Sequence, residues 1–197
     1  MTDSLNKHQL RRAMRRHRAS LSNSQLIAAQ NSLANQARKS NRLLQAQYIL
    51  SYAPFAGEIS PAKLVHSLAC ATVHLPRITN FRLSQMRFYS ADNVDTMNKY
   101  GIEEPRAIGA PWPANHFDLL LVPLVAFDRS GTRLGMGAGY YDRALEALSY
   151  QTSTKPYLIG LAHHFQEVNS LAREPWDVPL DAILTDRELI QIQLKNT

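Results

Sequence analysis

Three alternating glycines mark the part of the sequence that is best suited to chemistry. The segment reads Arg133-Leu134-Gly135-Met136-Gly137-Ala138-Gly139-Tyr140-Tyr141-Asp142-Arg143. Glycine tolerates positive φ and lets a ligand approach the backbone closely, so several N–H groups of such a loop can converge on one anion. No Gly-Lys-Ser/Thr follows, and the glycine spacing differs from that of the dinucleotide fingerprint, which excludes both of those nucleotide loops. The glycines alone leave a flexible hairpin open as the alternative.

Two charged side chains flank the glycines. Arg133 stands just before them, and a guanidinium group can bind phosphate oxygens through two hydrogen bonds. Asp142 follows Gly139 by three residues, in the first turn of the helix that we expect there. A carboxylate at this position can hold a magnesium ion that bridges nucleotide phosphates, although simple capping of the helix is the alternative. The flanks therefore favour a phosphate site over a hairpin without a ligand.

The elements that must position this loop follow from the hydrophobic pattern. Apolar runs predict buried strands at 48–52, 119–127, 157–162 and 182–185. A further strand is expected at 72–75, ending at Pro76, and an exposed strand at 82–89. Helical patterns lie between these runs, and residues 128–131 have turn-forming chemistry. Buried strands that alternate with helices are typical of a mainly parallel sheet covered on both faces. We predict a three-layer α/β fold with an open sheet.

Residues that are typical of helix N-termini indicate where the helices begin. We expect helices over residues 5–19, 22–42, 61–70 and 140–148, and a short helix or turn over 94–100. Ser4 is expected to cap the first helix, Ser22 and Gln25 have capping-box spacing, and Pro61 suits a first helical turn. Residues 101–117 are rich in proline and glycine and predict a long ordered loop.

Length and composition limit the possible classes of protein. A chain of 197 residues predicts a single domain over 1–197, and 45% hydrophobic with 19% charged residues argues against disorder and coiled coil. The longest apolar run, 119–127, is too short for a membrane helix. The single cysteine, Cys70, excludes an intramolecular disulfide and a cysteine-based zinc cluster, and we expect it to be a buried apolar residue. A reducing compartment fits, so we expect a cytoplasmic protein.

The positive charge is concentrated at the N-terminus. Residues 1–18 hold six basic residues and one acidic residue, whereas the rest of the chain holds 16 basic and 15 acidic residues. A near-neutral body argues against extensive binding of duplex nucleic acid. The basic segment could instead form a local anion site, a tail or a targeting signal. The segment superficially resembles a mitochondrial presequence, but it leads into the next helical pattern at Leu21 without a break. No apolar core follows the basic residues, so we expect no secretory signal.

The glycine segment resembles that of the 5-formyltetrahydrofolate cyclo-ligases, also called methenyltetrahydrofolate synthetases. The family motif is approximately R-L-G-x-G-x-G-Y-Y-D-R, and every fixed position is matched here. The similarity covers nearly the whole chain, including residues 7–11, Glu58, 100–105, 118–128, Gln166 and 176–181. This ordered set is more specific than the glycine motif alone.

The resemblance implies an ATP- and Mg²⁺-dependent ligase that forms a C–N bond. It would convert 5-formyltetrahydrofolate to 5,10-methenyltetrahydrofolate with release of ADP and phosphate, on a fold like that of the sugar-phosphate isomerases. Phosphorylation of the formyl oxygen would create a leaving group, and N10 would then attack. Such an enzyme positions two substrates and neutralises phosphoryl charge, which fits the lack of a persuasive Ser/His/Asp or Cys/His set. We expect a monomer with no nucleic-acid or membrane partner.

The resemblance also implies the nucleotide site. Lys7 and Arg11 would contact ATP phosphates, and their spacing of four puts both on one helical face. A solvated basic helix is the alternative, which we expect for Arg12, Arg15, Arg16 and Arg18. The family's ATP loop corresponds to Arg133, Leu134, Gly135, Met136, Gly137, Ala138, Gly139, Tyr140 and Tyr141. Arg133 and Asp142 would be catalytic.

Metal and folate contacts are implied in the same way. Asp142 and Asp177 would hold Mg²⁺, with Asp181 a weaker candidate because it opens a strand and could equally cap a turn. Glu58 would accept hydrogen bonds from pterin N–H groups, although an exposed acid after a glycine turn is the alternative. The residues facing the folate would be Met136, Gly137, Ala138, Gly139 and Tyr140. Flat surfaces for its rings, or core packing, could come from Tyr52, Phe55, Trp112, Tyr140 and Tyr141.

Two rival functions stay open at this point. The first is an enzyme of the same fold that activates another amide with ATP, in which the glycine loop is kept and the pocket around Glu58 differs. The second is a nucleic-acid-binding protein that uses the arginine-rich N-terminus, against which no recognised motif and no interleaved aromatic residues are found. We expect Glu103 and Glu104 to be solvated, and the adjacent His163 and His164 not to bind metal.

Overall fold

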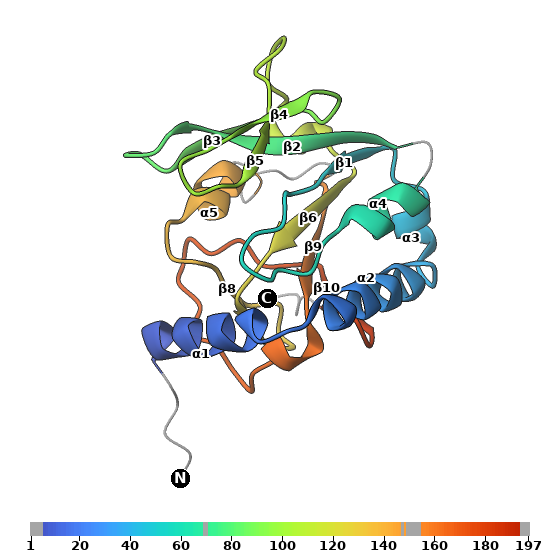
Figure 1. The fold of residues 1–197 in the computed structure, drawn as a ribbon, viewed down its shortest axis with the longest axis vertical. Coiled ribbons are helices and arrows are strands. Elements are labelled where there is room, and N and C mark those ends of the chain that lie inside the picture. The colour runs from blue at the N-terminus through green and yellow to red at the C-terminus, as the bar shows by residue number, and fades with distance from the viewer. Residues whose placement is uncertain (1–5, 69–70, 147, 149–154, 194–197) are drawn as a thin grey trace.

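A seven-stranded sheet forms the centre of the computed structural model, which describes residues 6–68, 71–146, 148 and 155–193 (Figure 1). Its order is β11-β10-β9-β6-β1-β2-β3. The parallel strands are β1 (Tyr48–Leu50), β2 (Thr72–Asn80), β6 (Leu119–Pro123), β9 (Tyr157–Ala162) and β10 (Ala182–Thr185). The antiparallel edges are β3 (Gln85–Ser90) and β11 (Leu189–Gln191). The predicted mainly parallel open sheet is confirmed, and β11 is an additional strand that the sequence did not predict.

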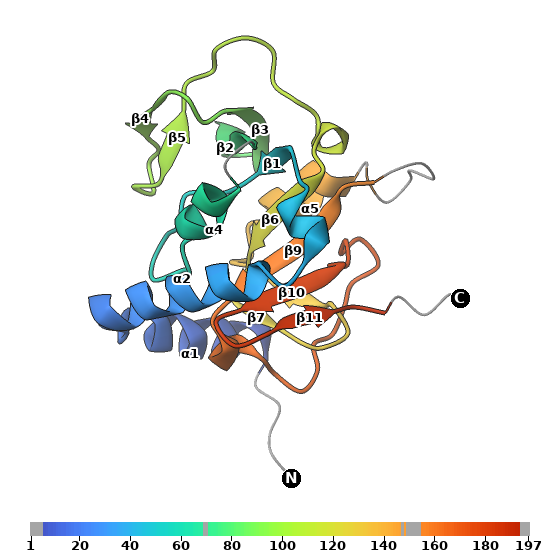
Figure 2. The same cartoon turned by 90° about the vertical axis from the view of Figure 1, so that its right-hand side faces the viewer.

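Helices cover both faces of this sheet, as expected. The helices of one face are α2 (Asn23–Ala37), α3 (Asn41–Leu44) and α4 (Ala62–Ser67), and α5 (Tyr140–Leu145) covers the other. Figure 2 shows the first three in front of the strands. Successive side chains of a strand point to opposite faces. Leu119 and Leu121 of β6 accordingly pack in the core beneath α2 and α4, whereas Leu120 and Val122 pack in the core beneath α5.

The helix α1 (Lys7–Ala19) lies on a small hairpin formed by β7 (Ala126–Phe127) and β8 (Arg133–Leu134). Leu10 of α1 packs against Ala126 and Leu134. Asn6 caps α1 in a capping box with Gln9, and the expected cap, Ser4, lies outside the described residues. This packing places the basic helix directly beside the glycine segment that follows β8.

Several expected elements have different ends in the structure. The predicted helix over 22–42 opens with the Ser22–Gln25 capping box but ends at Ala37, and α3 is separate. The predicted strand over 119–127 ends at Pro123, after which the chain turns into β7. The helix expected over 61–70 is α4, which begins after Pro61 as expected. Its expected end at Cys70 lies outside the described residues. The helix expected to reach 148 is α5, which ends at Leu145.

The strand expected to stop before Pro76 continues to Asn80 as β2, which was a wrong prediction. The C=O of His74 accepts a hydrogen bond from the N–H of Ser51 in the direction of β1. The backbone N–H and C=O groups of every second residue of β2 point to that side, and Pro76 is one of these residues. Because β1 pairs with β2 only as far as His74, no strand lies beside Pro76 on that side. The missing N–H of Pro76 therefore costs the sheet no hydrogen bond.

Of the segment expected to be a short helix or turn over 94–100, residues 94–97 are instead a strand and residues 99–100 form a turn. β4 (Val94–Met97) pairs with β5 (Glu103–Pro105) in an antiparallel hairpin, and Asn98 shapes its turn by accepting hydrogen bonds from Tyr100 and Ile102. The expected loop over 101–117 thus contains β5, and it also contains the short helix η1 (Ala114–His116). A second short helix, η3 (His164–Gln166), follows β9.

Glu104 ties this hairpin to the body of the protein. The prediction that Glu104 is solvated was wrong, because it is only 5% exposed. Its Oε1 accepts hydrogen bonds from the N–H of Ile78 and from Asn98 Nδ2, each at 2.9 Å. Glu103 beside it is exposed, as expected. Among the helices described, none combines the length and apolar character that crossing a bilayer requires.

Candidate functional site

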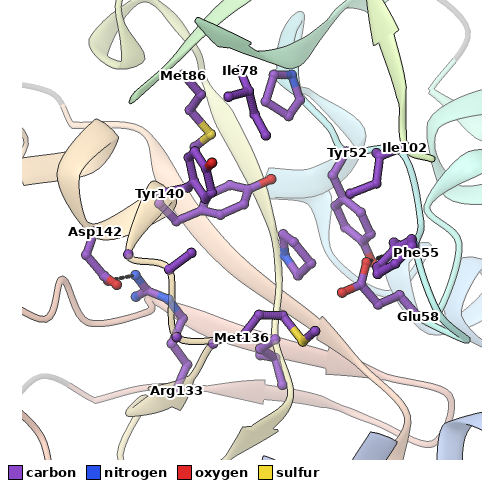
Figure 3. A pocket seen from close by; sticks show the side chains of 18 of the residues that line it. Tyr52, Phe55, Glu58, Ile78, Met86, Ile102, Arg133, Met136, Tyr140 and Asp142 are labelled. Carbon is purple, nitrogen blue, oxygen red and sulfur yellow. Dashed lines mark hydrogen bonds and ion pairs between the residues drawn. The ribbon is translucent and has the colours of Figure 1, made fainter. Parts of the chain in front are cut away.

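A cavity of about 530 Å³ opens at the carboxyl ends of β1 and β6, beneath the β4–β5 hairpin (Figure 3). Crevices at this edge of an open α/β sheet are the usual place for ligands. Most residues that the sequence analysis assigned to a site line this cavity, and the weaker candidates Asp181 and Trp112 do not. Those that line it include Lys7 and Arg11 of α1, Glu58 after β1, residues 133–142, and Asp177 near the C-terminus. Segments far apart in the sequence are therefore brought together, and the roles of these residues remain predictions.

The glycine loop enters the cavity from an ordered turn. Asp128 accepts hydrogen bonds from the N–H groups of Ser130 and Thr132, which holds the β7–β8 turn as predicted. After β8, Gly137 and Gly139 adopt φ values of 102° and 70°, which other residues rarely tolerate. In the described part of the chain, the N–H groups of residues 136–139 donate to no backbone carbonyl. These amides are available to an anion in the cavity.

Basic side chains of α1 lie against this loop. Arg11 Nε donates to the C=O of Gly135 at 2.9 Å, and Lys7 Nζ is paired with Glu174 Oε1 at 2.9 Å. Lys7 and Arg11 reach the same cavity from one helical face, as their spacing predicted. The outer arginines, Arg12, Arg15 and Arg16, are exposed as expected and line a second groove of about 950 Å³ that shares Arg11 with the cavity.

Arg133 and Asp142 are bonded to each other rather than pointing separately into the cavity. Arg133 Nη2 donates to Asp142 Oδ1, and Arg133 Nη1 donates to the C=O of Val178 (Figure 3). Asp177 accepts a hydrogen bond from the N–H of Glu174 at 2.9 Å. The charge of Asp142 is thus balanced by Arg133 when no ligand is bound.

Few carboxylates of the cavity could hold a metal ion. Among the described residues, no group of three or more His, Cys, Asp or Glu side chains is arranged to hold a metal ion. Magnesium needs fewer protein ligands, because it keeps water and takes phosphate oxygens from its substrate. Asp142 and Asp177 fit that pattern. Asp181 does not line the cavity, and its carboxylate instead accepts from the N–H of Leu158 and pairs with Lys155.

The opposite wall of the cavity is apolar around one carboxylate. Glu58 Oε2 accepts a hydrogen bond from the N–H of Phe55 at 3.0 Å. In Figure 3, Glu58 lies across the cavity from Arg133 and Asp142. Burial raises the pKa of Glu58, whereas the nearby Arg18 and the Phe55 amide act to lower it. The apolar wall comes from Tyr52, Phe55, Ile78, Met86 and Ile102.

Aromatic residues divide between the cavity and the core. Tyr52, Phe55, Tyr140 and Tyr141 line the cavity. Burial raises the pKa of Tyr141 well above its ordinary value, so it stays a neutral hydroxyl. Trp112 does not line the cavity, because it packs on His74 with ring centroids 4.3 Å apart.

Several cavity residues were not singled out by the sequence analysis, among them Tyr100, Met86 and Trp176. Tyr100 comes from the β4–β5 hairpin, Met86 comes from β3, and Trp176 stands 66% exposed at the mouth. No local pattern distinguishes Met86, because it reaches the cavity only through the fold. Tyr100 and Trp176 lie in matched family segments, which are signals that could have found them.

Arg18 departs most clearly from the sequence prediction. It was expected to be solvated with the outer arginines, but its side chain is fully buried and its Nη1 lies 3.5 Å from Glu58 Oε1. A signal was present in the sequence, since Arg18 follows Lys7 by 11 residues, which is about three helical turns. Lys7, Arg11 and Arg18 therefore share one face of α1.

Known proteins resemble this chain over most of its length. The model of the 5-formyltetrahydrofolate cyclo-ligase family matches residues 3–186. A Haemophilus influenzae protein named 5-formyltetrahydrofolate cyclo-ligase is 38% identical over 184 residues, covering 90% of this chain and 96% of that protein. An Escherichia coli K12 protein of the same name is 36% identical over 148 residues, covering 73% and 80%. The solved structure of Aquifex aeolicus 5,10-methenyltetrahydrofolate synthetase matches with a TM-score of 0.80 and 25% identity, covering 98% of this chain and 96% of that one.

Proposed function

The chain belongs to the 5-formyltetrahydrofolate cyclo-ligase family, and from this we propose that it is the enzyme that closes 5-formyltetrahydrofolate to 5,10-methenyltetrahydrofolate with ATP and Mg²⁺. One observation carries the proposal. A single cavity combines a glycine loop and basic side chains on one wall with a buried carboxylate and an apolar surface on the other. Both substrates of an ATP-driven ring closure could meet there.

The nucleotide would bind along the glycine loop. The N–H groups of residues 136–139 would receive phosphate oxygens, with Lys7 and Arg11 supplying positive charge from α1. Their present partners, Glu174 and the C=O of Gly135, hold both side chains at the loop before ATP arrives. Binding would exchange these contacts for phosphate contacts, which supports a site that is largely formed in advance.

The folate would lie against the opposite wall. Glu58 is an acceptor surrounded by apolar side chains, and the pterin ring presents N–H donors on a flat apolar body. Tyr52, Phe55 and Tyr140 offer aromatic surface beside it. The formyl group and the terminal phosphate would have to meet between the two walls, beside the amides of Met136 to Tyr140.

The chemistry needs positioning and charge neutralisation. The formyl oxygen attacks the terminal phosphorus and ADP leaves. N10 then attacks the formyl carbon and gives up its proton to the departing phosphate or to water, as the C–O bond breaks and phosphate leaves with that oxygen. Arg133 would stabilise the transferring phosphoryl group, and its bond to Asp142 keeps its guanidinium at the site. Asp142 and Asp177 would hold Mg²⁺, which supplies further neutralisation of phosphate charge. No protein nucleophile is required.

The test is a direct assay of this reaction. The purified protein is incubated with 5-formyltetrahydrofolate and MgATP, and the methenyl chromophore is followed with and without ATP. Folded protein that gives no ATP-dependent chromophore would overturn the proposal. Parallel reactions with other formamides separate it from an enzyme that activates a different amide. The cytoplasmic location, the monomeric state and the likeness to sugar-phosphate isomerase folds stay predictions.

A further inference from the structure

Arg18 is a buried charge that no step of the proposed reaction uses. Its side chain is 0% exposed and that of Glu58 is 10% exposed. Its Nη1 lies 3.5 Å from Glu58 Oε1, and its Nη2 lies 4.0 Å from the sulfur of Met136. Its Nε is buried without a hydrogen-bond partner among the described residues. Arg18 lines the second groove rather than the cavity, and it reaches the cavity through Glu58 and Met136, which both line it. Burying an arginine this incompletely paired opposes folding, so its presence calls for an explanation at Glu58.

The segment that carries Glu58 is clamped around Arg18. A Cβ on Gly57 would come within 2.8 Å of the backbone oxygen of Arg18, and Gly57 has a φ of 75°. On its other side, the C=O of Gly57 accepts from His163 Nε2 at 3.1 Å. Glu58 closes the turn, because its N–H donates to the C=O of Phe55 at 3.1 Å. The position of Glu58 is therefore set by its contact with α1.

The same helix contacts the glycine loop near one end and Glu58 at the other. Lys7 and Arg11 lie at the glycine loop, and Arg18 lies behind Glu58, about 16 Å further along the helix axis from Lys7. Arg18 also touches Met136, which is part of the glycine loop. A rigid helix with these three basic residues on one face fixes the distance between the nucleotide wall and the folate wall.

We propose that Arg18 is a positioning residue, which holds the Glu58 carboxylate as an oriented anion for the folate while taking no part in the chemistry itself. The inference rests on the proposed function, because it assumes that Glu58 accepts hydrogen bonds from the pterin. It goes further by assigning the recognition of folate to a buried pair formed between α1 and the turn after β1.

The groups around Glu58 fix the direction of a pH effect. Arg18 faces it from α1, Tyr52 from the segment after β1 and Tyr141 from α5, and Phe55 donates its amide. Burial raises the pKa of both tyrosines, so they stay neutral, and Arg18 is the positive charge that lowers the pKa of Glu58. Removing Arg18 must raise the pKa of Glu58 further. When the pH is lowered, Glu58 of the variant would therefore become protonated at a higher pH than Glu58 of the wild-type protein.

The experiment replaces Arg18 by Met, which keeps its length without its charge, and by Lys, which keeps the charge. Arg16→Met removes the same charge from an exposed position on α1 and is the matched control. We expect Arg18→Met to raise the KM for 5-formyltetrahydrofolate about tenfold and the KM for ATP less than about twofold. In a plot of kcat/KM for folate against pH, the fall on the acid side (the acid limb) should move to higher pH. Arg18→Lys should keep the wild-type limb, and Arg16→Met should change neither quantity.

Two outcomes would contradict a positioning role of Arg18. Equal losses for both substrates with an unmoved acid limb would show a purely structural role and overturn the proposal. If Arg18→Met does not fold, the double variant with Glu58→Gln removes the unpaired buried carboxylate and is compared with Glu58→Gln alone. Matching folate KM values support action through Glu58, whereas a further loss in the double variant overturns it.

One readout does not depend on turnover. The titration of Glu58 can be followed by NMR in the protein without ligand, and Arg18→Met should shift it to higher pH. An unshifted titration overturns the Arg18 inference even if the enzyme is active. A wild-type protein that shows this coupling but no ATP-dependent ring closure would overturn the proposed function instead.

Discussion

Gly137→Ala tests whether the shape of the glycine loop governs the binding of ATP. Gly137 has a φ of 102°, where a residue with a Cβ is strained by about 1–3 kcal/mol. The added Cβ would lie 3.4 Å from Arg11 Cζ, which is close but bearable for the end of a flexible side chain. Alanine also restricts the unfolded chain, which offsets about 0.4–1 kcal/mol. The net loss of folding stability should be about 1–2 kcal/mol.

Gly135→Ala is the matched control in the same loop. No atom lies within 4 Å of the Cβ that it would add, and Gly135 is absent from the positive-φ region. Thermal unfolding should therefore raise the Tm of Gly135→Ala by about 1–4 °C, because only the effect on the unfolded chain remains, and lower that of Gly137→Ala by about 2–8 °C, at about 2–4 °C per kcal/mol for a chain of this size.

Kinetics should separate the two substrates. A loop that no longer offers one amide to phosphate loses a charge-assisted hydrogen bond, so Gly137→Ala should raise the KM for ATP about tenfold or more. The KM for folate should rise less, because Glu58 and the apolar wall are untouched. A Gly137→Ala variant with wild-type Tm and wild-type ATP kinetics would refute the argument that this backbone conformation builds the site.

The remaining predictions concern charged side chains. Glu58→Gln should raise the KM for folate about 10- to 150-fold and leave that for ATP nearly unchanged, and equal effects on both would point to a structural or metal role. Asp142→Asn should keep the fold and lose activity by on the order of 100-fold, while the double change with Asp177→Asn should cost less than the two losses combined. Full activity of either single variant would remove that residue from the metal site. Replacing Lys7 and Arg11 by Gln should raise the KM for ATP alone, whereas replacing the outer arginines should do little. A larger effect of the outer arginines that fades with salt would indicate a general charge effect.

Local rules accounted for much of this fold. Ser22 and Gln25 formed their capping box because the groups that interact are three residues apart in the chain. The buried strands were evident because β6, β9 and β10 are covered on both faces and are therefore continuously apolar. Their alternation with helices was sufficient to predict the mainly parallel sheet.

The errors arose where contacts with distant segments of the chain determine the local structure. Pro76 continues a strand because β1 ends before reaching it, which depends on the pairing register. Residues 94–97 form a strand because β5 pairs with them and Glu104 anchors the hairpin to Ile78. No window of neighbouring residues contains either fact.

The candidate site shows the same division. The glycine loop and the charged residues near it were found because their types and spacing are local. Arg18 was grouped with the solvated arginines because its neighbours are basic and exposed. Its burial against Glu58, 40 residues later, depends on how α1 packs on the turn after β1. Its place on the face of Lys7 and Arg11 was the available signal.

The most direct test of the account follows the formyl oxygen. The protein is given 5-formyltetrahydrofolate labelled with ¹⁸O in the formyl group, together with MgATP, and both the methenyl chromophore and the mass of the released phosphate are measured. If the formyl oxygen is phosphorylated and then expelled by N10, each methenyl product is matched by one ADP and one phosphate that carries the label. Chromophore formation with unlabelled phosphate, or without ADP, would contradict the account.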